Sequence, residues 1–208
     1  MNNYDVVLFD LDGTLWNSTL QILPAWNIVL QRYNIEHRLS HQDIKGCMGK
    51  TAVQIAQRIL PDEPLERSLQ IVKACCQEEL IYLQKSGGTL YPHLEKTLRT
   101  LAGQHDLFIV SNCQEGYIET FLNVHKFNHY FKDFQWEGSH GQSKGENIRD
   151  LMMRNQLTAA VYVGDTQGDL DAADLAAIPF IHAAYGFGQV NRSVPAIHVF
   201  TELPSLCL

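Results

Sequence analysis

The sequence has few of the features that mark secreted, zinc-binding or membrane proteins. Its five cysteines are odd in number, include the adjacent pair Cys75-Cys76 and contain no C-x-x-C spacing, which argues against both a disulfide framework and a zinc site. The N-terminal stretch Met1–Asp5 lacks the basic region of a signal peptide. No apolar run approaches the roughly 18 residues of a membrane span. We therefore expect a cytoplasmic protein with reduced thiols and no membrane partner.

Positive charge is also scarce. The 16 lysines and arginines are outnumbered by 23 acidic residues, which gives a formal net charge of −7. This balance argues against nucleic acid or an anionic membrane as the main partner. It leaves phosphorylated small molecules open, because a bound metal ion inverts the local field at a single site. With 208 residues, 45% of them hydrophobic, the chain is large enough for one domain with a sizeable insertion, or for two small domains.

Short apolar runs alternate with helical patterns over most of the chain. The apolar runs predict strands at residues 6–9, 107–110, 134–136, 159–163 and 179–182, and the helical patterns fall at residues 92–102, 115–125, 144–155 and 169–177. Apolar strands alternating with helices are typical of a parallel sheet that is covered on both faces. The sequence therefore predicts an α/β fold with a doubly wound, Rossmann-like parallel sheet.

Residues 17–86 interrupt this alternation with a nearly continuous helical pattern. A structureless loop of that length is unusual inside a compact domain, so we expect a small helical cap inserted after the first strand. The predicted division is a core of residues 1–15 and 90–208 and a cap of residues 16–89. Hinges are expected near Trp16–Ser18 and Ser86–Leu90, the second of which contains two flexible glycines.

Two carboxylates close the first apolar run. Asp10 and Asp12 directly follow Val6–Phe9 and precede Gly13 and Thr14. In open α/β sheets, ligands bind just beyond the carboxyl ends of the strands. Two carboxylates this close repel each other unless a cation or a shared proton relieves them. The pattern indicates hard-metal chemistry, with one carboxylate free to act as a nucleophile.

Further polar groups fall at the ends of later elements. Ser111-Asn112 closes the strand at 107–110, Asp165 and Asp169 follow the strand at 159–163, and Lys144 begins the helix before it. Each has an ordinary alternative, because aspartates cap helices, Ser and Asn populate turns, and most lysines lie in solvent. Together with the opening Asp10-Leu11-Asp12-Gly13-Thr14, their order resembles the haloacid dehalogenase superfamily. The helical insertion after the first motif resembles the subfamily with a helical cap, and the resemblance covers essentially the whole chain.

The resemblance implies a role for each motif residue. Asp10 would attack phosphorus and become an aspartyl-phosphate. Asp12 would protonate the leaving oxygen and then deprotonate the hydrolytic water. Asp12 also favours phosphoryl transfer over dehalogenation, because the dehalogenase branch of the family lacks this second aspartate.

The resemblance also implies a Mg²⁺ cofactor and a phosphoryl-binding set. The metal ligands would be Asp10, the backbone carbonyl of Asp12, Asp165, and Asp169 either directly or through water. The groups that bind phosphoryl oxygens would be Thr14, Ser111, Asn112 and Lys144.

Two residues are candidates for contact with the organic part of the substrate. Lys50 lies in a loop, Gly46–Thr51, similar in placement to the cap loop that selects substrate in this subfamily, and would suit a second anionic group. The alternative is an exposed lysine in a helix connection. Trp16 lies close to Thr14 in sequence, and its alternative role is packing at the hinge.

The sequence therefore predicts a Mg²⁺-dependent phosphatase of a small phosphorylated metabolite, similar to the phosphoglycolate phosphatase group and acting as a monomer or homodimer. A phosphomutase of the β-phosphoglucomutase type and a pyrophosphatase or nucleotidase remain open. From a different class, a phosphoryl-accepting signalling domain or a non-catalytic binding protein is an alternative. The helical insertion and Asp12 speak against the signalling domain, and the presence of both Asp10 and Asp12 speaks against the binding protein.

Overall fold

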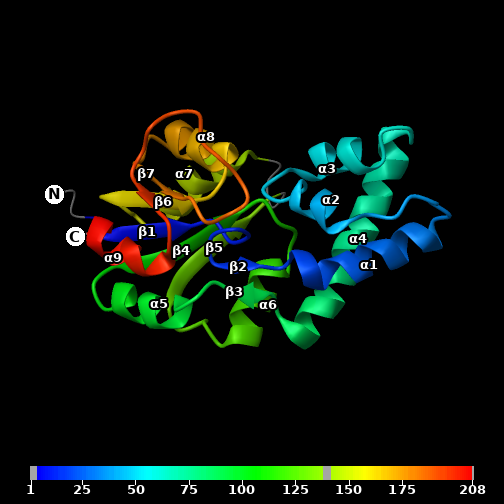
Figure 1. The fold of residues 1–208 in the computed structure, drawn as a ribbon. Helices are drawn as coiled ribbons and strands as arrows, with labels where there is room; N and C mark the ends of the chain where they lie inside the picture. The colour runs from blue at the N-terminus through cyan, green and yellow to red at the C-terminus, as the bar shows by residue number, and fades with distance from the viewer. Residues whose placement is uncertain (1–3, 138–141, 208) are drawn as a thin grey trace.

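The computed structural model describes residues 4–137 and 142–207. A six-stranded sheet forms its centre (Figure 1). In sheet order the strands are β5 (Phe131–Trp136), β4 (Asp106–Ser111), β1 (Val6–Phe9), β6 (Ala160–Gly164), β7 (Phe180–Ala183) and β8 (Ala196–Ile197). All five pairings between neighbouring strands are parallel. The carboxyl ends of the strands therefore meet at one edge of the sheet.

β1 lies at the centre because both of its faces are apolar. All four of its residues are buried, and they alternate between two hydrophobic clusters. Val7 and Phe9 belong to one cluster, whereas Val6 and Leu8 belong to the other. A strand that is buried on both faces is typical of a sheet covered by helices on both sides.

Helices cover both faces of the sheet (Figure 1). α7 (Lys144–Arg154) and α8 (Gln167–Ala176) pack against each other on one face, where Ile148 and Leu170 join the cluster of Val6 and Leu8. The opposite face is covered by α5 (Leu94–Ala102), α6 (Tyr117–His125) and α9 (Leu203–Cys207). The predicted doubly wound α/β fold is confirmed.

The insertion after β1 is helical, as predicted. It consists of α1 (Thr19–Arg32), α2 (His41–Lys45), α3 (Ala52–Ile59) and α4 (Leu65–Ser86). These helices gather at one side of the sheet, away from α9 (Figure 1). α1 and α4 pack along each other through buried side chains that include Trp26 and Cys75. We call residues 19–86 the cap helices.

The two chain segments that join the cap helices to the sheet lie side by side. β2 (Trp16–Asn17) pairs antiparallel with β3 (Thr89–Leu90). The Trp16 indole packs against the backbone at Gly88, where a Cβ atom would lie 2.7 Å from the ring. Both predicted hinge regions thus include one strand of this two-stranded ribbon. The core and cap boundaries at residues 15, 16, 89 and 90 remain a prediction.

Several element limits differ from the sequence-based expectation. α5 begins at Leu94 instead of near Pro92, because His93 adopts a left-handed conformation with φ of 62°. α8 begins at Gln167, since Thr166 caps it and Asp169 lies within its first turn. β8 and α9 were not predicted, because a two-residue strand and a five-residue helix are too short to produce a periodic pattern.

No helix within residues 4–137 or 142–207 combines the length and apolar character that spanning a bilayer requires.

Candidate active site

The strand ends bring the predicted carboxylates together. Phe9 of β1 is level with Ile109 of β4 and Val163 of β6. Asp10 and Asp165, which come just after β1 and β6, are therefore neighbours at the carboxyl edge of the sheet. Both are almost completely buried, with exposed fractions of 1% and 0%.

Lys144 reaches this edge from the start of α7. The side chain of Ser143 caps the helix in a capping box with Glu146, which fixes Lys144 as the first helical residue. Its Nζ lies 2.8 Å from Asp10 Oδ1 and 2.5 Å from Asp169 Oδ1. Burial alone would lower the pKa of Lys144, but the two carboxylates raise it well above its ordinary value. Lys144 is therefore charged here and is not a solvated surface lysine.

Three buried carboxylates form a candidate metal site. Asp10, Asp165 and Asp169 each offer an oxygen within 4.8 Å of the others. Burial raises the pKa of Asp10 to about 6, although Lys144 favours its charged form, and burial raises the pKa of Asp165 well above its usual range. Among the described residues, Asp10 Oδ2 and Asp165 Oδ1 have no hydrogen-bond partner. Unpartnered carboxylate oxygens and excess buried negative charge fit a hard divalent cation.

Asp169 differs from the other two carboxylates because both of its oxygens are already engaged. Oδ2 accepts hydrogen bonds from the backbone N–H groups of Asp165 and Thr166 and from the Thr166 hydroxyl. Oδ1 contacts Lys144. Asp169 therefore has the helix-capping role that the sequence left open. It also lies beside the candidate metal site.

Asp12 is directed toward a different set of partners. Its Oδ1 accepts a hydrogen bond from Ser18 Oγ at 2.7 Å and lies 3.1 Å from the Tyr117 hydroxyl. Burial raises the pKa of Asp12 to about 7. A carboxyl that holds a proton near neutral pH is suited to general acid–base chemistry.

Gly13 permits the turn that separates Asp10 from Asp12. Its φ is +86°, a value that favours glycine, and a Cβ atom here would lie 2.1 Å from Asp165 Oδ2. The Asp165 carboxylate is held against this turn by a hydrogen bond of 2.6 Å from the backbone N–H of Phe187. The glycine therefore serves both the turn and the close approach of Asp165.

The predicted phosphoryl-binding residues lie around the same carboxylates. Thr14 is buried, and its Oγ1 has no hydrogen-bond partner among the described residues. Ser111 is also buried, and its hydroxyl favours the charged form of Asp10. The side chain of Asn112 points elsewhere, because its Nδ2 donates to the carbonyl oxygen of Gly49 in the cap at 3.2 Å.

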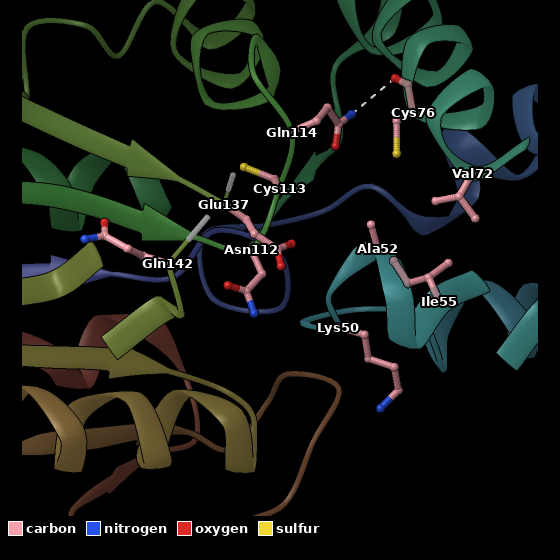
Figure 2. A pocket seen from close by; sticks show the side chains of 10 residues that line it. All are labelled: Lys50, Ala52, Ile55, Val72, Cys76, Asn112, Cys113, Gln114, Glu137 and Gln142. Atoms are coloured by element: carbon pink, nitrogen blue, oxygen red, sulfur yellow. Dashed lines mark hydrogen bonds between the residues drawn. The ribbon is translucent and has the colours of Figure 1, made fainter. Parts of the chain in front are cut away.

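A cavity of about 350 Å³ lies between the cap and the carboxyl edge of the sheet (Figure 2). Asn112, Cys113 and Gln114 line it from the loop after β4. Lys50, Ile55 and Val72 are among the residues that line it from the cap. A hollow of about 50 Å³ shares several of these lining residues and reaches Asp12. The cavity is thus placed to hold the organic part of a ligand whose reacting group lies at Asp10 and Asp12.

The two candidates for substrate contact occupy different positions. Lys50 lines the cavity, but its side chain extends away from Gln114 and Cys113 (Figure 2). Trp16 is completely buried and packs edge-on against Tyr117 and Phe121. Trp16 therefore has the packing environment that the sequence offered as its alternative.

Several site residues were not identified from the sequence. Ser18 and Tyr117 contact Asp12, and Glu79 and Gln114 connect the cap to the cavity. Ser18 lies four positions after Thr14 and Gln114 lies two positions after Asn112, and this closeness to predicted site residues was the available signal. Tyr117 and Glu79 lie inside helical patterns and resemble ordinary helix residues in sequence.

A doubly wound sheet with an inserted helical cap and a buried acidic site at its carboxyl edge defines a capped α/β enzyme. The sequence profile of the haloacid dehalogenase-like hydrolases matches residues 7–183. The chain therefore belongs to the haloacid dehalogenase-like hydrolase family.

Relatives of known name and solved structure are consistent with this family. A phosphoglycolate phosphatase of Aquifex aeolicus is 25% identical over 195 residues, covering 91% of this chain and 89% of the relative. A haloacid dehalogenase-like hydrolase of Bacteroides fragilis superposes with a TM-score of 0.85 at 22% identity, covering 97% of this chain and 100% of that structure. A predicted phosphoglycolate phosphatase of Haemophilus somnus superposes with a TM-score of 0.83 at 22% identity, with full coverage of both chains. At such identities the structural likeness is a likeness of fold.

Proposed function

We propose that the protein hydrolyses phosphate monoesters of small metabolites in a Mg²⁺-dependent reaction that passes through an aspartyl-phosphate on Asp10. Family membership and the phosphatase relatives make the chain a phosphoric monoester hydrolase. The observation that carries the mechanism is the state of Asp10. Its Oδ1 is held by Lys144, whereas its buried Oδ2 is unpartnered among the described residues.

This arrangement prepares Asp10 for attack. Lys144 fixes the carboxylate through Oδ1, so Oδ2 is the oxygen that forms the bond to phosphorus as the bond between phosphorus and the leaving oxygen breaks. Asp12 gives its proton to that leaving oxygen. Asp12 then takes a proton from the water that attacks the aspartyl-phosphate, which releases inorganic phosphate and restores the Asp10 carboxylate.

Ser18 and Tyr117 keep Asp12 in place for both proton transfers. They approach the same oxygen, Oδ1, at 2.7 and 3.1 Å. This leaves the second carboxyl oxygen of Asp12 available to exchange a proton with the leaving group and then with water.

The residues that would hold Mg²⁺ are Asp165 through its unpartnered oxygen, Asp10 through the oxygen that does not attack phosphorus, the backbone carbonyl of Asp12, and Asp169 directly or through water. A bound Mg²⁺ supplies positive charge that offsets the buried carboxylates and the charge of the transferred phosphoryl group. Lys144 adds a second positive charge on the same side. For the phosphoryl oxygens we propose the hydroxyls of Thr14 and Ser111 and the backbone N–H of Asn112 as donors.

The relatives named phosphoglycolate phosphatase make phosphoglycolate one candidate substrate. It carries a second anion, for which Lys50 is the predicted partner. A phosphomutase remains the second candidate, because the contact between Asn112 and the Gly49 carbonyl closes the cap loop onto the core, and exclusion of water favours return of the phosphoryl group to the substrate.

The test is phosphate release by the purified protein with Mg²⁺ or with EDTA. The panel contains phosphoglycolate, hexose phosphates, nucleotides, pyrophosphate and p-nitrophenyl phosphate. Release that requires Mg²⁺ supports the proposal. Conversion of a hexose 1-phosphate to its isomer without phosphate release supports the phosphomutase instead.

Asp10→Asn is the decisive variant, because it keeps the shape of the side chain and removes its charge and nucleophilicity. We expect it to abolish turnover. The matched control is Asp62→Asn at an exposed position of the cap, which should behave as the unchanged protein. Turnover retained by Asp10→Asn would refute the aspartyl-phosphate.

A further inference from the structure

The amide of Gln114 connects the core to the cap through both of its N–H groups. Nε2 donates to Glu79 Oε1 at 2.7 Å and to the carbonyl oxygen of Cys76 at 3.2 Å. Both acceptors belong to α4, and the second bond is drawn in Figure 2. An amide nitrogen has two hydrogens, so these two acceptors use its full donor capacity.

Glu79 is itself fixed and nearly inaccessible. Trp26 Nε1, which can only donate, is hydrogen bonded to Glu79 Oε2. Glu79 is 4% exposed, so it cannot exchange these partners for solvent. Both oxygens of Glu79 are therefore engaged, one by Trp26 and one by Gln114.

This network determines which way the Gln114 amide faces. With the amide reversed, its oxygen would face the carbonyl oxygen of Cys76, which can only accept, so this hydrogen bond would be lost. The amide oxygen is therefore directed to the other side. Figure 2 shows it directed away from the Cys76 carbonyl oxygen and lying, in this view, between the side chains of Cys113 and Cys76. Gln114 lines both the cavity of about 350 Å³ and the hollow that reaches Asp12.

The part of the cavity wall near Gln114 offers an anionic group little attraction. Near Gln114 the wall consists of Cys76, Cys113 and Val72. Glu137 adds a carboxylate to the same cavity. The amino group of Lys50 ends away from Gln114 (Figure 2). Beside Gln114, the polar group that this wall offers to a ligand is thus the amide oxygen, an acceptor that matches a hydroxyl donor and would repel a carboxylate.

We propose that the organic part of the substrate is a neutral, hydroxyl-bearing group of the polyol or sugar class, and that the Gln114 amide oxygen selects it by accepting a hydrogen bond from one of its hydroxyls. Glu79 is the positioning residue that holds this amide. The inference rests on the proposed phosphatase function and specifies its substrate class. It predicts that phosphoglycolate, whose organic part carries a carboxylate, is one of the poorer substrates.

The first experiment uses the unaltered protein with Mg²⁺ and compares glycerol 3-phosphate with propyl phosphate. Both esters release a primary three-carbon alcohol, and they differ in the two further hydroxyls. We expect kcat/KM to be about tenfold or more higher for glycerol 3-phosphate, because the analogue leaves the buried acceptor unpartnered. Equal values for the two esters, or phosphoglycolate exceeding glycerol 3-phosphate by a similar factor, would overturn the inference.

Variants of Gln114 and Glu79 test whether these two residues cause the preference for glycerol 3-phosphate. Gln114→Met keeps the length of the side chain and removes the amide, so the ratio of kcat/KM between the two esters should fall toward one. Glu79→Gln leaves either Trp26 or Gln114 facing an N–H donor, and it should lower the ratio mainly by raising KM for glycerol 3-phosphate. Gln104→Met, at an exposed position after α5, is the matched control and should keep the ratio. A melting curve for each variant confirms that it is folded.

The outcomes separate the two proposals. If p-nitrophenyl phosphate and propyl phosphate release phosphate and hydroxylated esters are not preferred, the proposed substrate class is refuted. The proposed phosphatase function is still supported by that result. No release from any ester refutes both. A preference that persists in folded Gln114→Met refutes the role of this residue.

Discussion

The hydroxyl of Tyr117 lies 3.1 Å from Asp12 Oδ1, although 105 positions separate the two residues. Tyr117 begins α6, in the core, whereas Asp12 follows β1. The same hydroxyl lies 2.8 Å from Ser18 Oγ, at the entrance to the cap helices. The proposed acid–base group is therefore held by residues from both sides of the connection between core and cap.

Loss of the Tyr117 hydroxyl should reduce turnover. Tyr117→Phe keeps the ring, which packs against Trp16, and removes one of the two hydroxyls at Asp12. We expect kcat to fall about tenfold with a smaller change in KM, since one hydrogen bond is lost and it orients a proton-transfer group. Steady-state kinetics with p-nitrophenyl phosphate measures both quantities, and Tyr82→Phe in α4 is the control. An unchanged kcat would contradict the assignment.

Removal of the Lys144 charge should destabilise the protein. Lys144→Met leaves Asp10 and Asp169 without the cation that contacts both. Breaking a buried ion pair costs roughly 3–5 kcal/mol of unfolding free energy. Denaturant unfolding measures the change, and the exposed Lys96→Met is the control. We expect added Mg²⁺ to recover part of the loss, and a stability equal to that of the unaltered protein would argue against the buried pair.

Metal binding should be detectable without turnover. A ligand that binds only the folded state raises its stability with concentration, so Mg²⁺ should raise Tm relative to EDTA. Asp165→Asn removes one ligand and one buried negative charge, which should raise Tm in EDTA and shrink the shift produced by Mg²⁺. A full Mg²⁺ shift in this variant would show that the cation binds elsewhere. The exposed Asp62→Asn should keep the full shift.

Glu79 should make stability depend on pH. Burial raises its pKa from 4.5 to about 8, and the neighbouring Asp12 adds to this increase. Between these two values the folded state keeps a proton that the unfolded state releases, so the free energy of unfolding falls as pH rises through this window. Glu79→Gln is neutral in both states and lacks this dependence. We expect the Tm of Glu79→Gln minus the Tm of the unaltered protein to increase from about pH 5 to about pH 8. A Tm difference that stays constant over this range would contradict the raised pKa of Glu79.

The sequence was sufficient for the fold because its signals are local. An apolar run such as Val6–Phe9 can only be satisfied by burial on both faces, and polar residues at the ends of parallel strands necessarily share one edge of the sheet. The sequence alone therefore predicts that Asp10, Asp165 and Lys144 lie close together.

The remaining contacts depend on how the cap packs on the core. Nothing in the pattern of α4 distinguishes Glu79 from the other charged residues of that helix, because its burial is created by Trp26 from α1 and Gln114 from the core. The orientation of Asp12 toward Tyr117 likewise follows from the three-dimensional path of α6. Contacts of this kind carry no periodicity and no spacing that a single sequence reveals.

The pairing of β2 with β3 brings the two ends of the cap insertion together. Asn17 and Thr89 are directly opposite each other in the ribbon, and residues opposite in an antiparallel pair have Cα atoms only about 5 Å apart. A hairpin turn of two residues could join them and close the core chain without the cap helices. Exchange of the segment between Asn17 and Thr89 would replace the cap side of the cavity wall and Ser18, whereas Gln114 and the carboxylates at the sheet edge would stay. The cap side of the wall can therefore change in evolution while the phosphoryl chemistry is kept, as long as a hydroxyl remains at position 18 to hold Asp12.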